Sequence, residues 1–326
     1  MKILETKNLK KSFPVKSGFF SRVKGFVKSV QDVSFDIAPG ETLGLVGESG
    51  CGKTTVARLV LRLHELDSGN IFFEGQEVGN LRGQDLKPFR KKTQMVFQDP
   101  YASLNPRMRV SSIIAEPMDI HEPVSSRERQ ERVESLLEQV GLDKSFANRY
   151  PHEFSGGQRQ RIGIARAISL NPKLIVADEP VSALDVSVSA QIVKLFQKLQ
   201  EEKGISYLFI SHDLKVVRHV SHRVAVMYLG KIVEIAPKEN WAKPLHPYSK
   251  ALIAAIPIPD PTRKVTRVVL PGEIPSPMNP PSGCSFHPRC PFAEKRCSEE
   301  EPELKEWAPK QWAACHLIGR IGPMSL

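Results

Sequence analysis

The chain has 326 residues, and its 46 Lys and Arg residues outnumber its 36 Asp and Glu residues, which gives a formal net charge of +10. Hydrophobic residues make up 40% and charged residues 25%, a composition that excludes a disordered chain, a fibrous repeat and a coiled coil. No run of about 18 apolar residues occurs, and residues 1–11 lack the apolar segment of an export signal. We therefore expect a soluble cytosolic protein, whose positive charge suits nucleic acid, an anionic membrane surface or phosphate ligands.

The first 250 or so residues alternate short β-branched runs with longer amphipathic stretches, which is typical of an α/β domain. The apolar runs at 43–46 and 174–177 show no alternation, as expected of strands buried on both faces of a parallel sheet. Between about 99 and 163 the strand signal is absent, which predicts a helical subdomain. The expected strands are 3–7, 30–37, 42–46, 70–73, 93–97, 174–177, 207–211 and 223–228. The expected helices are 53–64, 126–140, 155–169, 187–203 and 213–220.

Two segments depart from this pattern. Residues 16–28 interleave basic with apolar side chains, which fits either a solvated loop or an element that rests on lipid headgroups or a partner. After about residue 257 prolines are frequent and hydrophobic periodicity is weak. We therefore do not expect this tail to build an ordinary core, and it needs another means of stabilisation, such as a bound metal or cross-link. We therefore predict one domain over 1–257, with the helical subdomain at about 99–163, and a Pro-rich, Cys-rich region over 258–326.

A glycine-rich loop follows the apolar run at 43–46. Its sequence fits G-x-x-x-x-G-K-[ST] and precedes an expected helix, as a phosphate-binding loop requires. Backbone N–H groups and the helix N-terminus would bind phosphate oxygens, with Lys53 at the β- and γ-phosphates and Thr54 on Mg²⁺. Cys51 is expected to be only a small loop residue. The residues assigned to nucleotide binding here are Gly47, Ser49, Gly50, Cys51, Gly52, Lys53, Thr54 and Thr55.

Two carboxylates follow the second buried run, at the strand end where open α/β sheets bind ligands. Asp178 is suited to hold Mg²⁺ through water. Glu179 points differently, one residue on, and could polarise an attacking water. The alternative is that both belong to a solvated turn.

The segment from Phe154 to Arg161, FSGGQRQR, resembles the signature of ATP-binding cassette (ABC) ATPases. Other family elements appear in order: Gln98 resembles the Q-loop residue, SALD ending at Asp185 the D-loop, and His212 the switch histidine. The resemblance implies that ATP and Mg²⁺ bind. It places Thr54, Gln98 and Asp178 at the metal, Glu179, His212 and Gln98 at hydrolysis, and Phe13 against adenine.

Cassettes of this family close head to tail, so the resemblance implies a dimer in which one set of residues contacts the ATP of the opposite subunit. That set is Ser155, Gly156, Gly157, Gln158 and Asp185.

More narrowly, the segments 46–53, 97–106, 178–187, 246–250 and 270–277 resemble the dipeptide/oligopeptide (and nickel) importer branch, and are similar to the second ATPase subunit of dipeptide importers. The branch implies a peripheral protein at the cytoplasmic face of the inner membrane that powers import. Its partners would be two integral membrane permease subunits, a paralogous ATPase subunit and, indirectly, an extracytoplasmic peptide-binding protein, with no nucleic acid. Residues 101–108 would receive the coupling helix of a permease.

Four of the five cysteines crowd into the last 43 residues, with the spacing Cys284-x5-Cys290-x6-Cys297-x17-Cys315. Disulfides are unusual in a cytosolic chain, so the cluster favours metal ligation. Structural zinc sites usually have close C-x(2–4)-C pairs, which are absent here, whereas wider gaps are compatible with an iron–sulfur cluster. The branch resemblance implies a [4Fe-4S] cluster of structural role. Zinc and unmetallated thiols stay open, and His287 or His316 could replace a thiolate.

Other functions compete with a transporter motor. The charge of +10 would suit a soluble ABC ATPase that acts on nucleic acid or ribosomes. However, relatives in translation usually carry two cassettes, and those in DNA repair insert long coiled coils, whereas only 108 positions separate Gly47 from Ser155 here. A nickel importer and a redox-sensing regulator built on the tail are further alternatives.

Overall fold

The computed structural model describes residues 2–17, 22–256 and 270–320, and it confirms an α/β fold with a mixed sheet. Residues 18–21 of the basic segment and the expected boundary at 257/258 lie outside the described residues. In the parts that are described, no helix combines the length and the apolarity that crossing a membrane requires.

The main sheet has eight strands in the order β11-β12-β10-β9-β3-β8-β7-β6. The strands from β9 to β6 are parallel, and β10, β12 and β11 add to one edge in antiparallel pairs. The carboxyl ends of the parallel strands therefore share one edge, where α/β sheets bind ligands. The bounds are β3 Thr42–Val46, β6 Thr93–Val96, β7 Leu174–Asp178, β8 Ser206–Ile210, β9 Arg223–Tyr228, β10 Lys231–Pro237, β11 Lys305–Ala308 and β12 Gln311–Ala313.

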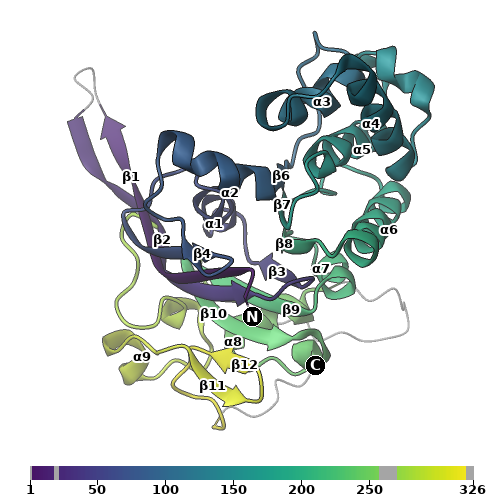
Figure 1. Ribbon diagram of the computed structural model, residues 1–326. Coiled ribbons are helices and arrows are strands. Elements are labelled where there is room, and N and C mark those ends of the chain that lie inside the picture. Colours follow the sequence, from purple (N-terminus) through teal and green to yellow (C-terminus); the bar gives the residue numbers. More distant parts are fainter. Residues whose placement is uncertain (1, 18–21, 257–269, 321–326) are drawn as a thin grey trace, which may run out of the picture.

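A second, antiparallel sheet has the order β2-β1-β4-β5, with β1 Leu4–Ser17, β2 Arg22–Ile37, β4 Ser68–Phe73 and β5 Gln76–Glu77. The solvated-loop interpretation of residues 16–28 is wrong for the described part, because β1 and β2 pair from Leu4↔Ile37 as far as Ser17↔Arg22. The ladder satisfies the backbone polar groups of the segment, and the two strands project from the body of the molecule (Figure 1). Val23 and Phe26 remain about half exposed on this hairpin.

The helices cover the main sheet and fill the segment where no strand was expected. Helix α1 is shorter than predicted because the chain turns at Arg62, which has a φ of 53°. Helices α2, α3, α8 and α9 were not predicted individually. The α-helices are α1 Lys53–Val60, α2 Lys87–Lys92, α3 Val110–His121, α4 Ser126–Gln139, α5 Gly156–Ile168, α6 Val186–Lys203, α7 Leu214–Val220, α8 Pro247–Ala254 and α9 Lys295–Glu299. The 3-10 helices are η1 Gly83–Leu86, η2 Lys144–Asn148, η3 Pro151–Glu153, η4 Lys238–Ala242 and η5 His287–Arg289.

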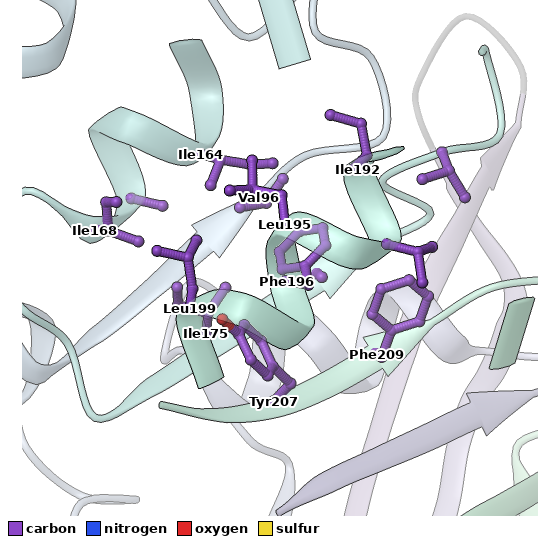
Figure 2. Packing of buried hydrophobic residues seen from close by; sticks show 14 of the residues in the cluster. Val96, Ile164, Ile168, Ile175, Ile192, Leu195, Phe196, Leu199, Tyr207 and Phe209 are labelled. Atoms are coloured by element: carbon purple, nitrogen blue, oxygen red, sulfur yellow. The ribbon is translucent and has the colours of Figure 1, made fainter. Parts of the chain in front are cut away.

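Both faces of the main sheet are covered, as the apolar runs predicted. Along β7, Ile175 and Ala177 join the core on the side of α3 to α6, whereas Leu174 and Val176 join the core beneath the second sheet and α1. Figure 2 shows the first of these cores, where α6 packs on β8 and α5 lies against β6 and α6. The ring of Phe196 meets those of Tyr207 and Phe209 edge to face, at centroid distances of 5.4 and 5.8 Å.

The tail does not build a core of its own but joins that of the cassette. Strand β12 pairs with β10 through Glu234↔Ala313 and Ile235↔Trp312, which extends the main sheet (Figure 1). The buried ring of Phe286 belongs to the same apolar core as β7 and β8. The last described residues therefore fold by ordinary strand pairing and burial, which the high proline content before them concealed.

Candidate functional site

The phosphate loop connects β3 to α1 and wraps around the ammonium group of Lys53. Gly52 has a φ of 111°, and a Cβ there would lie 2.2 Å from the Ser29 carbonyl oxygen, so only glycine fits. The buried Lys53 Nζ donates to the carbonyl oxygens of Gly47 and Glu48 at 2.9 and 3.0 Å. A positive group at the opening of a helix is the arrangement that binds anions such as phosphate.

Two other residues of the loop, Cys51 and Thr55, pack or bond within the fold. Burial raises the pKa of the Cys51 thiol, which suits a small packing residue and not a nucleophile. The hydroxyl groups of Thr55 and Ser29 lie 2.7 Å apart, which ties the start of α1 to β2.

The first pair of polar side chains beyond the loop joins α1 to β7. Thr54 Oγ1 donates to Asp178 Oδ1 at 3.3 Å. Asp178 is 4% exposed, and its burial raises the pKa of the carboxyl, with Glu179 as a further cause. A divalent cation beside this pair would stabilise the charged carboxylate, because oxygen ligands and negative charge are what Mg²⁺ prefers.

Two segments converge on the carboxylate of Glu179. Its Oε2 accepts a hydrogen bond from Gln98 Nε2 at 3.1 Å and lies 3.0 Å from Nδ1 of His212. The residue has a φ of 46°, and its N–H donates to the Ile210 carbonyl at 2.8 Å, which fixes the turn at the end of β7. A carboxylate held in this way can accept a proton from a neighbouring water.

The signature segment opens α5 as a helix cap. Ser155 Oγ accepts from the Gln158 N–H at 3.3 Å, and Gln158 Oε1 accepts from the Ser155 N–H at 3.0 Å. A Cβ on Gly157 would lie 2.4 Å from Val188 Cγ1, so α5 starts in close contact with α6. Asp185 caps α6 by accepting from the Val188 N–H at 2.9 Å, which also lowers the pKa of this carboxyl.

The start of each of these helices is open to solvent. Ser155, Gly156 and Asp185 are exposed, and the side chain of Val186 is 88% exposed. Two capped helix N-termini therefore lie beside each other on an uncovered face.

The ring of Phe13 lies on β1, half-buried, next to the chain that follows α1. It meets His64 edge to face at a centroid distance of 5.6 Å, and Lys11 Nζ lies 5.6 Å from its centre. Burial lowers the pKa of His64, with Arg58 and Lys11 as further causes.

A cavity of about 700 Å³ opens beside Thr54, Gln98 and Asp178 and extends between β6 and α3. Phe97 and Ile120, which line it, are 40% and 57% exposed. The residues that the sequence assigned to the metal thus line a hollow whose walls carry both apolar and charged side chains.

The four cysteines of the tail are free thiols in a shared, largely buried environment. Cys284 N–H donates to the Cys297 carbonyl at 2.8 Å. Burial raises the pKa of Cys284 to about 12 and that of Cys290 to about 11, with the other tail thiols as a smaller cause. Burial likewise raises the pKa of Cys315.

The geometry of these side chains gives the expected iron–sulfur cluster no support. Among the residues that the structure describes, no group of three or more His, Cys, Asp or Glu is arranged to hold a metal ion. The rings of His287 and His316 lie 3.0 Å from the backbone carbonyl oxygens of Cys284 and Glu300.

Sequence reasoning missed the contacts that the tail makes with the phosphate loop. Arg289 donates to Glu48, and the Glu48 N–H donates to Tyr248 Oη. Glu48 occupies a position of the loop motif that accepts any residue. Arg289 lies between Cys284 and Cys290, and only the cysteines of that segment belong to a recognisable pattern. No periodicity or motif links positions that are 241 residues apart.

Comparisons with known proteins agree with this geometry. The family described as "ABC transporter" matches residues 30–182, and that described as "Oligopeptide/dipeptide transporter, C-terminal region" matches residues 233–297. The chain is 58% identical to the oligopeptide transport ATP-binding protein AppF of Bacillus subtilis, over 97% of both chains. It is 54% identical to the probable peptide ABC transporter ATP-binding protein y4tS of Sinorhizobium fredii, over 97% of this chain and 90% of that one.

A solved structure is similar as well. The dimeric, post-hydrolysis ATP-binding cassette MJ0796 bound to ADP and Pi has a TM-score of 0.65 and 29% identity, and the match covers 72% of this chain and 98% of that one. The chain belongs to the family of ABC transporter ATP-binding proteins and is an ATP-hydrolysing cassette subunit.

Proposed function

We propose that this chain is the motor subunit of a membrane importer for dipeptides or oligopeptides. The observation that carries the catalytic part is the convergence of Gln98 and His212 on Glu179, next to the Thr54–Asp178 pair. Peptide as the cargo is supported by the names of the relatives, which are oligopeptide and peptide transport proteins, and by the matched C-terminal region.

In the proposed mechanism the triphosphate of ATP lies in the loop from Gly47 to Thr55, and adenine lies on Phe13. The ammonium group of Lys53 leaves the loop carbonyl oxygens and binds the β- and γ-phosphates. It does so because the formal negative charge of a phosphate attracts it more strongly than the partial charge of a carbonyl oxygen. Thr54, Gln98 and Asp178 would hold Mg²⁺, which would supply positive charge against the charge that develops on the phosphates. Oxygen ligands of this kind suit Mg²⁺, and the Thr54–Asp178 contact keeps two of them together.

Hydrolysis then depends on Glu179. Its carboxylate accepts a proton from a water whose oxygen attacks the γ-phosphorus, and the bond from that phosphorus to the β,γ-bridging oxygen breaks to leave ADP. His212 and Gln98 orient the carboxylate through their contacts with its Oε2, at 3.0 and 3.1 Å. Aligning the attacking water in this way is the main task of a phosphoryl-transfer site.

We further propose that two cassettes close over ATP, with a paralogous ATPase subunit as the partner. Ser155, Gly156, Gly157, Gln158 and Asp185 would then contact the nucleotide held by the opposite subunit. Their support is the exposed pair of helix N-termini at α5 and α6, which offers N–H groups and a favourable dipole to an anion. The exposed side chain of Val186 beside them suits a face that a second subunit covers.

Two integral membrane permease subunits are the other proposed partners, with an extracytoplasmic peptide-binding protein reached only through them. The cavity between β6 and α3, with its exposed Phe97 and Ile120, and the following residues 101–108 suit the coupling helix of a permease. The protein would then be peripheral, at the cytoplasmic face of the inner membrane. Within it, 1–257 would act as the cassette, with the helical subdomain at about 99–163, and 258–326 as the peptide-importer region.

The tail thiols are proposed to hold a [4Fe-4S] cluster with a structural role. Support comes from the number and spacing of the four free cysteines of the tail. Their side chains are not arranged around a metal in the described residues. Iron and acid-labile sulfide analysis of anaerobically purified protein tests this, with about four of each per chain expected. Stoichiometric zinc, or no metal, would contradict it.

The ATP-binding and hydrolysis roles are tested together by Glu179→Gln. The variant is expected to bind MgATP with unchanged affinity, to stop turnover and to accumulate as a closed dimer with its partner subunit. Size-exclusion chromatography with and without ATP measures the dimer, and phosphate release measures turnover. Lys53→Ala serves as the control that loses binding itself. Normal turnover by Glu179→Gln would refute the role proposed for Glu179.

A further inference from the structure

The C-terminal region reaches the phosphate loop through an arginine that the catalytic scheme above does not use. Arg289, in η5 just before Cys290, donates through Nη1 and Nη2 to Oε2 and Oε1 of Glu48 at 2.8 and 3.2 Å. The arginine side chain is 8% exposed and that of Glu48 is 24% exposed. A two-pronged, largely buried pair of this kind is stronger and more directional than an exposed ion pair.

The backbone of the same glutamate is held from the same side. The Glu48 N–H donates to Oη of Tyr248 at 2.9 Å, and Tyr248 in α8 is fully buried. The Tyr248 ring packs on Tyr228 and Phe286 at centroid distances of 4.7 and 5.4 Å. Because Phe286 belongs to the tail, the aromatic cluster fixes Tyr248 and the segment of Arg289 against the same part of the core.

The position of Glu48 in turn determines the position of Lys53. The Glu48 carbonyl oxygen accepts from Lys53 Nζ at 3.0 Å, and the neighbouring Gly47 carbonyl does so at 2.9 Å. A rotation of the peptide groups at Glu48 would therefore move an acceptor of the lysine and the direction of the loop N–H groups. Loops rich in glycine resist such rotation little by themselves, because glycine has the widest choice of backbone conformation.

We propose that Arg289 is a positioning residue of the nucleotide site. Through Glu48 it holds the phosphate loop in the conformation that receives the triphosphate, so the C-terminal region is a working part of the ATP site. Tyr248 holds the same residue by its backbone. The inference rests on the proposed role of residues 47–55 in binding ATP.

A simpler role for the pair would be to fasten the tail to the cassette. The two roles differ in a measurable way: fastening changes only the stability of the protein, whereas positioning changes the affinity for nucleotide. A preorganised loop binds its ligand without a further ordering cost, so loss of the clamp weakens binding.

The test uses the full-length chain with Arg289→Ala. We expect the Kd for MgATP, measured by calorimetry on the non-hydrolysing Glu179→Gln background, to rise about tenfold, equivalent to about 1.4 kcal/mol. On the wild-type background the KM for MgATP should rise by a similar factor, while kcat changes less. The melting temperature without nucleotide is recorded for every variant, so that a loss of fold is separated from a loss of affinity.

Arg320→Ala is the matched control. It removes another two-pronged arginine–carboxylate pair of the tail, that of Arg320 with Glu294, at 3.3 and 2.9 Å, whose arginine is 67% exposed. An exposed pair of this kind contributes little to stability, and it lies away from Glu48. We expect the Kd for MgATP to stay within about twofold of the Kd of the Glu179→Gln chain that keeps Arg320. Substitutions of exposed residues normally have effects of this small size.

Three further variants make the result specific to the loop. Glu48→Gln should raise the Kd as Arg289→Ala does, and the double variant should bind no more weakly than either single one, since both remove the same interaction. Arg289→Lys should recover part of the affinity, because a lysine can still contact Glu48 at one point. Tyr248→Phe, which removes only the hydroxyl acceptor, should weaken binding without loss of fold.

Two results would overturn the proposal. One is a Kd for Arg289→Ala within twofold of the reference while the melting temperature falls. The other is an unchanged Kd for MgATP in both Arg289→Lys and Tyr248→Phe. This second result decides the question if Arg289→Ala does not fold. Lys53→Ala separates these failures from a failure of the ATP site itself, because retained affinity in Lys53→Ala would refute the assignment of residues 47–55.

Discussion

Glycine at position 52 shows how one residue links chain geometry to nucleotide binding. Its left-handed backbone and the 2.2 Å that would separate a Cβ from the Ser29 carbonyl leave no room for a side chain. The loop motif predicted that position 52 needs a glycine. It could not predict that the Ser29 carbonyl oxygen is what excludes a side chain there, because that contact comes from β2 in the second sheet.

Gly52→Ala should therefore weaken MgATP binding, since a forced shift of the loop costs about 1–3 kcal/mol and every 1.4 kcal/mol corresponds to about tenfold in affinity. Gly163→Ala is the matched control: it lies within α5, without a positive φ and with nothing within 4 Å of its Cβ position. The control should bind MgATP normally and gain about 0.5–1 kcal/mol in unfolding free energy. Equal affinities in the two variants would contradict the geometry assigned to the loop.

A second residue, His246, makes the stability of the fold depend on pH. It is buried, its Nδ1 accepts from the Tyr248 N–H at 3.1 Å, and its burial lowers the pKa of the imidazole to about 3. The neutral ring is therefore required in the native state, while the unfolded chain takes up a proton near pH 6.5. Stability from this group is complete above pH 6.5 and is lost as the pH falls towards 3.

Between pH 7.5 and 5.5 this difference should lower the unfolding free energy by about 1.4 kcal/mol. Denaturant unfolding at the two pH values measures it. His246→Gln, whose side-chain oxygen can accept the same N–H, should show a pH dependence that is smaller by that amount. An identical pH dependence in the two proteins would show that His246 titrates alike in the folded and unfolded states.

At the scale of elements, the strands and helices that carry the site were predictable because each has a local signal. The runs of β3 and β7 are apolar without alternation, and α5 and α6 begin at capping residues, Ser155 and Asp185. Residues 3–7 and 30–37 were predicted as strands, but the extension of β1 and β2 beyond them was missed because its basic side chains resemble a loop, although ladder pairing needs only backbone groups. The edge strand β12 was missed because it is short and stands behind a proline-rich stretch.

Helix α6 offers a test of the core that holds the ends of β7 and β8 in place. Phe196→Ala removes a fully buried ring that packs on Tyr207 and Phe209 (Figure 2), and it should lower the unfolding free energy by about 3–5 kcal/mol. Lys194→Ala, on the exposed face of the same helix, should change it by less than about 0.5 kcal/mol. Denaturant titration of both variants at one pH measures the difference. A loss for Phe196→Ala no larger than that for Lys194→Ala would contradict the packing.

For the whole molecule, the net charge of +10 suited nucleic acid, a membrane surface or phosphate ligands alike, and the proposed function uses the last two. The family and the phosphate site followed from motifs that are contiguous in sequence. The contact between Arg289 and Glu48 did not, since the pairing of segments 241 residues apart is decided by the packing of α8 and the tail on the main sheet. The chain thus has a C-terminal region that is built into the cassette.

The central claim is that ATP hydrolysis at Glu179 drives peptide import. Its most direct test is uptake of a labelled dipeptide into proteoliposomes that hold this chain together with its permeases, its partner ATPase and the peptide-binding protein, with MgATP on the side of the cassettes. The expected result is uptake that requires ATP with the unmodified chain and no uptake with Glu179→Gln, although that variant still binds MgATP. Uptake at the unmodified rate by Glu179→Gln, or ATP-driven uptake of nickel but not of peptide, would contradict the claim.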